Sequence, residues 1–156
     1  MTGRGAVVNT ALVEGAALLH DLDKALPAGD PVRALGHGAG GAAWLRANGY
    51  EELAEPVALH PVYVLGEAAD YDAWTAGASI EARIVAYSDK RAIQDLVTLD
   101  QRFERWYRRY PNSTMLTTVG YERARRLERE LCAAAGISPS EVRRLDWVDE
   151  ALRQAA

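Results

Sequence analysis

Residues 10–25 have the sequence TALVEGAALLHDLDKA, and this stretch predicts the first helix of the protein. One face of the helix is formed by residues three or four positions apart, namely Leu12, Ala16, Leu19 and Asp23. Pro27 and Gly29 are expected to end the helix, since neither residue favours its continuation. His20 and Asp21 are therefore predicted near its C-terminal end.

The rest of the chain repeats this pattern of helical segments separated by turn residues. Helices are predicted over residues 37–48, 51–60, 79–95, 98–110, 114–135 and from 138 onward. Thr98 and Gln101 have the spacing of a capping box. Residues 61–78 are predicted to form a long loop, in which Tyr71 and Trp74 are candidates for substrate contact. Because no segment shows sustained period-two alternation, we expect an all-α fold, a compact bundle of about six to seven helices.

Length and composition indicate one globular unit. A chain of 156 residues with 49% hydrophobic content can close a core without further domains. We expect a single domain over residues 1–156, with residues 111–156 as a C-terminal helical extension. Cys132 is the only cysteine, which excludes a disulfide within one chain and favours a reducing, cytoplasmic setting. No segment predicts a signal peptide or a membrane span.

Charge is distributed unevenly along the chain. Residues 1–100 carry 14 acidic and 7 basic residues, whereas residues 101–156 carry 8 acidic and 11 basic residues. The acidic part also contains all three histidines, which favours a cation site there. Arginine alternates with glutamate in the basic part, which indicates a solvated face with ion pairs. Its arginines and aromatic residues have ordinary amphipathic spacing, so we do not expect nucleic-acid binding.

His20, His37 and His60 are each predicted at the end of a helix, and Asp21 follows His20 directly. Imidazole nitrogen with carboxylate oxygen suits Mn, Fe, Zn or Mg. Taken singly, each histidine has an ordinary structural interpretation. Asp89 by itself is typical of an ion pair, and Lys24 is a lysine that complements a helix dipole.

The order of these residues resembles the HD superfamily of metal-dependent phosphohydrolases. The resemblance lies in four segments: AALLHDLDK at residues 16–24, HG at 37–38, VALH at 57–60 and EARIVAYSDK at 81–90. It covers roughly residues 11–110. Residues 111–156 contain no motif of this kind.

The resemblance implies an α-helical fold that hydrolyses phosphomonoesters or phosphodiesters of nucleotides or other small phosphorylated molecules. One or two divalent ions, Mn, Fe, Mg or Zn, would be held by five ligands: His20, Asp21, His37, His60 and Asp89. It further implies that Asp21 and Lys24 are catalytic and that Lys24, with Lys90 and Arg91, contacts the substrate.

Two departures from the family pattern leave alternatives open. Asp23 replaces a small residue of the motif, and we expect it to face solvent. The family also has a histidine on a helix before the HD pair, yet none of the 19 residues before His20 is a histidine. Exposed apolar surface at that place would favour a homodimer. A non-catalytic sensor or assembly module and, less favoured, a di-iron oxygenase therefore compete with the phosphohydrolase.

Overall fold

The computed structural model describes residues 7–67, 69–143 and 153, and these residues confirm the all-α prediction. They form no β-strand, and their extended pairing is limited to an isolated bridge between Ala92 and Leu96. The α-helices are α1 (Thr10–Leu19), α2 (Leu22–Ala25), α3 (Ala39–Ala47), α4 (Glu51–Leu59), α5 (Val62–Glu67), α6 (Tyr71–Gly77), α7 (Ile80–Arg91), α8 (Leu99–Arg109) and α9 (Gly120–Ala135). Short 3-10 turns cover Pro31–Leu35 and Glu141–Arg143, and a π-helical turn covers Met115–Val119.

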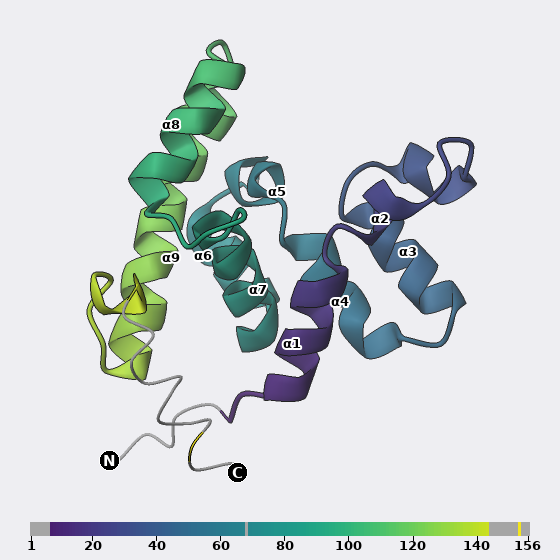
Figure 1. Ribbon diagram of the computed structural model, residues 1–156, viewed down its shortest axis with the longest axis horizontal. Coiled ribbons are helices and arrows are strands. Elements are labelled where there is room, and N and C mark those ends of the chain that lie inside the picture. Colours follow the sequence, from purple (N-terminus) through teal and green to yellow (C-terminus); the bar gives the residue numbers. More distant parts are fainter. Residues whose placement is uncertain (1–6, 68, 144–152, 154–156) are drawn as a thin grey trace.

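Helix α7 lies at the centre of the molecule and separates two apolar clusters (Figure 1). The smaller cluster joins α1, α3, α4 and α7 and consists of Ala16, Ala42, Leu45, Ala54, Val57 and Val85. The larger cluster joins α5, α6, α7, α8 and α9 and includes Leu65, Tyr71, Ala86, Leu99, Phe103 and Leu127. Each fully buried large side chain contributes roughly 1.5–3 kcal/mol to folding. Both clusters therefore fix the position of α7, which carries Asp89.

The predicted helix over residues 10–25 is interrupted after Leu19. Helix α1 ends with His20 as its C-cap, and α2 begins only at Leu22. Asp21 between them has φ −96° and ψ 17°, outside the α-helical region. Consecutive side chains on a continuous helix point about 100° apart. The interruption removes this constraint and allows His20 and Asp21 to face the same centre.

The prediction of a long loop over residues 61–78 is wrong, because this segment forms α5 and α6. The Pro61 carbonyl accepts hydrogen bonds from the amides of Val64 and Leu65 and so opens α5. Asp70 caps α6 by accepting from the Ala73 amide. Proline before a first turn and aspartate at an N-cap are helix-starting signals, which the interpretation as a loop did not use.

Tyr71 and Trp74 belong to the larger apolar cluster and do not line a substrate site. They are 5% and 7% exposed, respectively. The Tyr71 hydroxyl donates to Glu130 of α9, and the Arg126 guanidinium lies 4.2 Å from the centroid of the Tyr71 ring. These contacts attach α6 to α9, so the prediction of substrate contact for this pair is wrong.

Helix α7 ends at Arg91, four residues before the predicted end. Ala92 is extended, and the chain folds back so that the Val97 amide donates to the Arg91 carbonyl. The predicted capping box of α8 is confirmed, with Thr98 and Gln101 bonding each other's backbone amides. Gly136 has φ 70° and ends α9 as predicted. The helix predicted after Ser138 lies mostly outside the described residues, which show only the turn Glu141–Arg143.

The C-terminal segment contributes to the core as well as to the surface. Leu127 of α9 is fully buried in the larger cluster. The ion pairs expected of the basic part are present, for example between Arg125 and Asp100 at 2.9 Å. Among the described residues, no helix has the length and apolar character needed to cross a membrane.

Candidate metal centre

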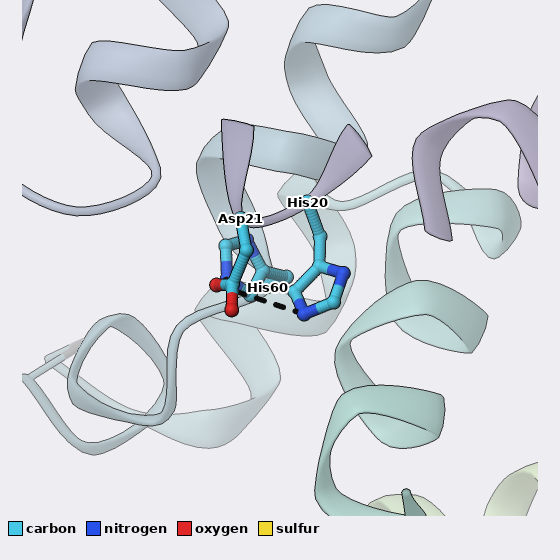
Figure 2. Close-up of side chains that lie close together, drawn as sticks. All are labelled: His20, Asp21 and His60. Atoms are coloured by element: carbon cyan, nitrogen blue, oxygen red, sulfur yellow. Dashed lines mark ion pairs between the residues drawn. The ribbon is translucent and has the colours of Figure 1, made fainter. Parts of the chain in front are cut away.

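All five predicted ligands come together where α1, α3, α4 and α7 meet. His20 is the C-cap of α1 and His60 the C-cap of α4, while Asp89 lies in the last turns of α7. Asp21 occupies the interruption between α1 and α2, and His37 lies two residues before α3. Figure 2 shows the side chains of His20, Asp21 and His60 pointing toward one another.

One carboxylate oxygen lies at the middle of the centre. Asp21 Oδ1 is 3.6 Å from His20 Nε2, 3.4 Å from His37 Nε2 and 3.9 Å from His60 Nε2. The His60 ring stands nearly perpendicular to the other two imidazoles, with centroids 5.0 Å from His20 and 4.7 Å from His37. His20, Asp21 and His60 each offer one donor atom within 4.8 Å of the other two.

The three imidazoles present the same nitrogen to the centre because each Nδ1 is engaged on the other side. His20 Nδ1 lies 2.7 Å from the Ala17 carbonyl, and His60 Nδ1 lies 2.6 Å from the Val57 carbonyl. These are carbonyls of the last helical turn, which lack a partner within the helix. His37 Nδ1 lies 3.1 Å from both oxygens of Asp23. Because each Nδ1 faces an acceptor, Nδ1 carries the proton of the neutral ring. The Nε2 atom of that ring is then left with a lone pair.

With the ring protons on Nδ1, the lone pairs of the Nε2 atoms face one another. His60 Nε2 and His37 Nε2 are 3.1 Å apart, and neither carries a proton if Nδ1 of each neutral ring does. His60 is fully buried, and this burial lowers its pKa from 6.5 to about 4, so the ring is neutral at neutral pH. Burial opposes the ionisation of Asp21, but the hydrogen bond from the Lys24 ammonium and its positive charge act against this effect, and the pKa of Asp21 is lowered.

The donor set fits a divalent cation. Two donors bound to one ion at about 2.0 to 2.1 Å stand about 2.8 to 3.4 Å apart at octahedral or tetrahedral angles. The spacings around Asp21 Oδ1, 3.4 to 3.9 Å, and the 3.1 Å between two imidazole nitrogens are close to this range. A positive ion would relieve the repulsion among the converging lone pairs. Histidine nitrogen with carboxylate oxygen suits Mn, Fe or Zn.

Asp23 does not face solvent, and that prediction is wrong. Its side chain is 10% exposed and holds the His37 ring through both carboxylate oxygens. The side chain lies against α3, since a Cβ atom on Gly41 would be in ordinary van der Waals contact with Asp23 Oδ1 at 3.7 Å. A carboxylate behind a ligating histidine fixes the tautomer and orientation of the ring. The sequence did contain a signal, because Asp23 lies on the same helical face as Ala16 and Leu19.

The turn before α3 completes the position of His37. Gly38 has φ 78°, a backbone conformation that side chains other than glycine rarely adopt. A Cβ atom there would also approach Pro61 Cγ to 2.7 Å. The Tyr63 hydroxyl of α5 donates to the His37 carbonyl. The predicted loop over residues 61–78 assigns no role to Tyr63, because the contact exists only once this segment forms α5.

Two cationic side chains flank the ligands. Lys24 Nζ lies 2.7 Å from Asp21 Oδ1, and this lysine is 57% exposed, which leaves its side chain accessible from solvent. Asp89 Oδ1 lies 3.6 Å from His20 Nε2 and 3.5 Å from Arg102 Nη2. Arg102 of α8 was interpreted as part of a solvated face, and its position beside Asp89 was not predicted.

The structure does not support a substrate-binding role for Lys90 or Arg91. Lys90 is fully buried, and its Nζ donates to the carbonyls of His60 and Ala86 at 2.8 Å each. Burial lowers the pKa of Lys90 to about 8. Arg91 is 3% exposed and pairs with Glu128 at 2.7 Å. Lys90 holds the backbone carbonyl of His60, a candidate ligand, and Arg91 attaches α7 to α9.

Comparison of the chain with protein-family models, with curated proteins and with solved structures gave no match. Inference about its function therefore depends on the convergence of His20, Asp21, His37, His60 and Asp89 and on the resemblance of the motifs that contain them.

Proposed function

We propose that this chain is a metal-dependent phosphohydrolase of the HD type that acts on a nucleotide or another small phosphorylated molecule. The observation that carries the proposal is the convergence of three imidazole Nε2 atoms on Asp21 Oδ1 at 3.4 to 3.9 Å. A bound cation would offset the repulsion within this arrangement, and the residues that form it occur in an order that resembles the HD superfamily. The proposed ligands are His20, Asp21, His37, His60 and Asp89.

A bound divalent ion would supply Lewis acidity toward a phosphoryl oxygen and would acidify water at the site. The chain's own residues prepare the centre for this role. Asp21 faces all three histidines and stays ionised, because Lys24 donates to it at 2.7 Å. Asp23 keeps the His37 ring in one orientation. The exposed Lys24 ammonium can neutralise an oxygen of the incoming phosphate.

Metal analysis combined with hydrolysis tests the proposal. Protein purified without chelator should retain close to one or two equivalents of Mn, Fe or Zn. When loaded with metal, it should hydrolyse a chromogenic phosphomonoester or members of a nucleotide panel. His37→Ala should lower the metal content and the hydrolysis together, because it removes one of the converging nitrogens. Glu52→Gln, on the exposed start of α4, should change neither.

Two results would contradict the proposal. If metal-loaded protein cleaves no phosphoester, the proposed activity fails. If full metal occupancy accompanies that inactivity, the centre fits a sensor or assembly module. If His37→Ala leaves the metal content unchanged, the convergence of His37 on Asp21 has no role in metal binding.

A further inference from the structure

Arg102 approaches the candidate metal centre from α8, on a different element from Lys24. Its Nη2 lies 3.5 Å from Asp89 Oδ1, the same oxygen that lies 3.6 Å from His20 Nε2. Lys24 contacts Asp21, the other carboxylate beside His20. Asp21 thus has a cationic neighbour on α2, and Asp89 has one on α8 besides the buried Lys90, whose Nζ lies 3.8 Å from Asp89 Oδ2.

The guanidinium of Arg102 is held in place but has unused donors. It lies 4.5 Å from the centroid of the Trp106 ring, a cation–π arrangement one helical turn along α8. Its side chain is 18% exposed, and its Nε is buried without a hydrogen-bond partner. The contact with Asp89 is at the outer limit of a hydrogen bond.

Arg91 shows how this chain engages an arginine with a structural role. The Arg91 Nε donates to the Val97 carbonyl at 2.6 Å, and its Nη1 donates to Glu128 at 2.7 Å. Arg102 makes no comparably short contact among the described residues, although it carries five N–H groups. An arginine that is fixed by an aromatic ring and weakly engaged beside candidate metal ligands has the properties of an anion receptor.

We propose that Arg102 binds the phosphate group of the substrate at the metal centre, with Trp106 keeping the guanidinium in place. This inference rests on the proposed function, which supplies the cation next to Asp89. The planar guanidinium matches two oxygens of a phosphate group, which a lysine cannot do. Arg102 and Lys24 would then contact different oxygens of one phosphate, since they approach from α8 and α2.

Binding of inorganic phosphate to manganese-loaded protein, measured by calorimetry, tests Arg102 apart from turnover. Arg102→Gln should weaken phosphate binding roughly 10- to 100-fold, the loss expected for one charge-assisted hydrogen bond. Its manganese content should equal that of the wild type. Arg105→Gln, at an exposed position of the same helix, is the matched control and should bind phosphate as the wild type does. Arg102→Lys should be intermediate, because it keeps the charge and loses the planar fork.

The outcomes separate this inference from the proposed function. Wild-type protein that retains no metal contradicts both. Wild-type protein that binds metal and hydrolyses phosphoesters, while Arg102→Gln keeps its phosphate affinity, contradicts the role of Arg102 alone. If Arg102→Gln loses manganese or unfolds, Arg102→Lys decides the question. Arg102→Lys with full metal content and unchanged phosphate affinity would show that the guanidinium is not needed.

Discussion

Asp23 determines how His37 faces the centre, and its removal is the most direct test of that arrangement. The carboxylate lies 3.1 Å from His37 Nδ1 through both oxygens. Loss of a carboxylate behind a ligating histidine typically weakens metal binding by about 10- to 100-fold. We expect this loss for Asp23→Ala and a smaller one for Asp23→Asn, since the amide oxygen still accepts from the ring. Competition with a chelating dye measures the affinity.

We expect the loss of metal affinity in Asp23→Ala to come from the position of the carboxylate more than from the loss of one negative charge. Glu52→Gln removes a negative charge from an exposed position of α4 and serves as the control. If Asp23→Ala binds metal as tightly as Glu52→Gln does, then Asp23 does not orient a ligand.

Arg91 should contribute to stability and not to substrate binding. It is buried with Glu128, and the two groups are 2.7 Å apart. Removing one member of a buried ion pair costs about 3–5 kcal/mol, because the remaining charge is uncompensated. Arg91→Met should lower the free energy of urea-induced unfolding by about this amount, and Arg91→Met with Glu128→Leu should recover much of it. A loss of phosphate affinity without a loss of stability would restore Arg91 as a substrate-binding candidate.

At this scale the sequence predicted which residues converge but not what supports them. His20, Asp21, His37, His60 and Asp89 could be identified because their order along the chain resembles a known pattern. Asp23 lies on the apolar face of the predicted helix, which indicates burial but not its contact with His37. No pattern indicates that Arg102 lies beside Asp89, since a guanidinium on a helix is usually exposed. Their contacts depend on the packing of α2 against α3 and of α8 against α7, which spacing along the chain does not determine.

Contact between α3 and the turn at Pro31–Leu35 depends on one glycine. A Cβ atom at Gly40 would collide with the Val32 carbonyl oxygen, a backbone atom that cannot rotate away. Overpacking of this kind costs about 1–3 kcal/mol. We therefore expect Gly40→Ala to lower the midpoint of thermal unfolding and to reduce metal affinity, because α3 begins two residues after His37.

The same substitution at Gly77 is the matched control. Gly77 is the last residue of α6, and a Cβ atom there meets nothing within 4 Å. Alanine is favoured over glycine in helices by about 1 kcal/mol. Gly77→Ala should leave stability unchanged or raise it. Equal destabilisation by both variants would contradict the close approach of Gly40 to Val32.

Helices with a clear start and stop were predicted close to their observed bounds. The capping box at Thr98 and the stop at Gly136 are examples. Interruptions were predicted poorly, because they depend on tertiary contacts. The apolar pattern continues through His20, so only the fold reveals that the helix stops there. For residues 61–78, Pro61 and two glycines favour a loop in the sequence, whereas Val62 and Leu65, which are buried in the structure, have the spacing of a helix.

Across the whole molecule, the candidate centre lies where one helix belongs to both apolar clusters. Val85 of α7 packs in the smaller cluster, and Ala86 packs in the larger one. Asp89 and Lys90 follow on the same helix, and Lys90 donates to the carbonyl of His60 on α4. The position of the ligands therefore depends on both clusters, so loosening either one should disturb the centre.

Burial of His60 makes the stability of the metal-free protein sensitive to acid. Burial lowers its pKa from 6.5 to about 4 in the folded chain, whereas the unfolded chain has the ordinary value. The unfolded state thus binds the proton more readily, and stability falls as the pH drops from about 6.5 toward 4. In the presence of a chelator, lowering the pH from 7.5 to 5 should reduce the unfolding free energy by about 2 kcal/mol from this residue.

Urea unfolding of wild-type protein and of His60→Gln at both pH values isolates the effect. The variant should be less stable at pH 7.5, because glutamine cannot reproduce the hydrogen bond from His60 Nδ1 to the Val57 carbonyl. It should nevertheless lose less stability on acidification, since glutamine does not titrate. Titratable groups that do not contact His60 contribute equally to both proteins and cancel in the difference. An identical pH dependence in the two proteins would mean that His60 takes up its proton equally well in the folded chain, which its complete burial opposes.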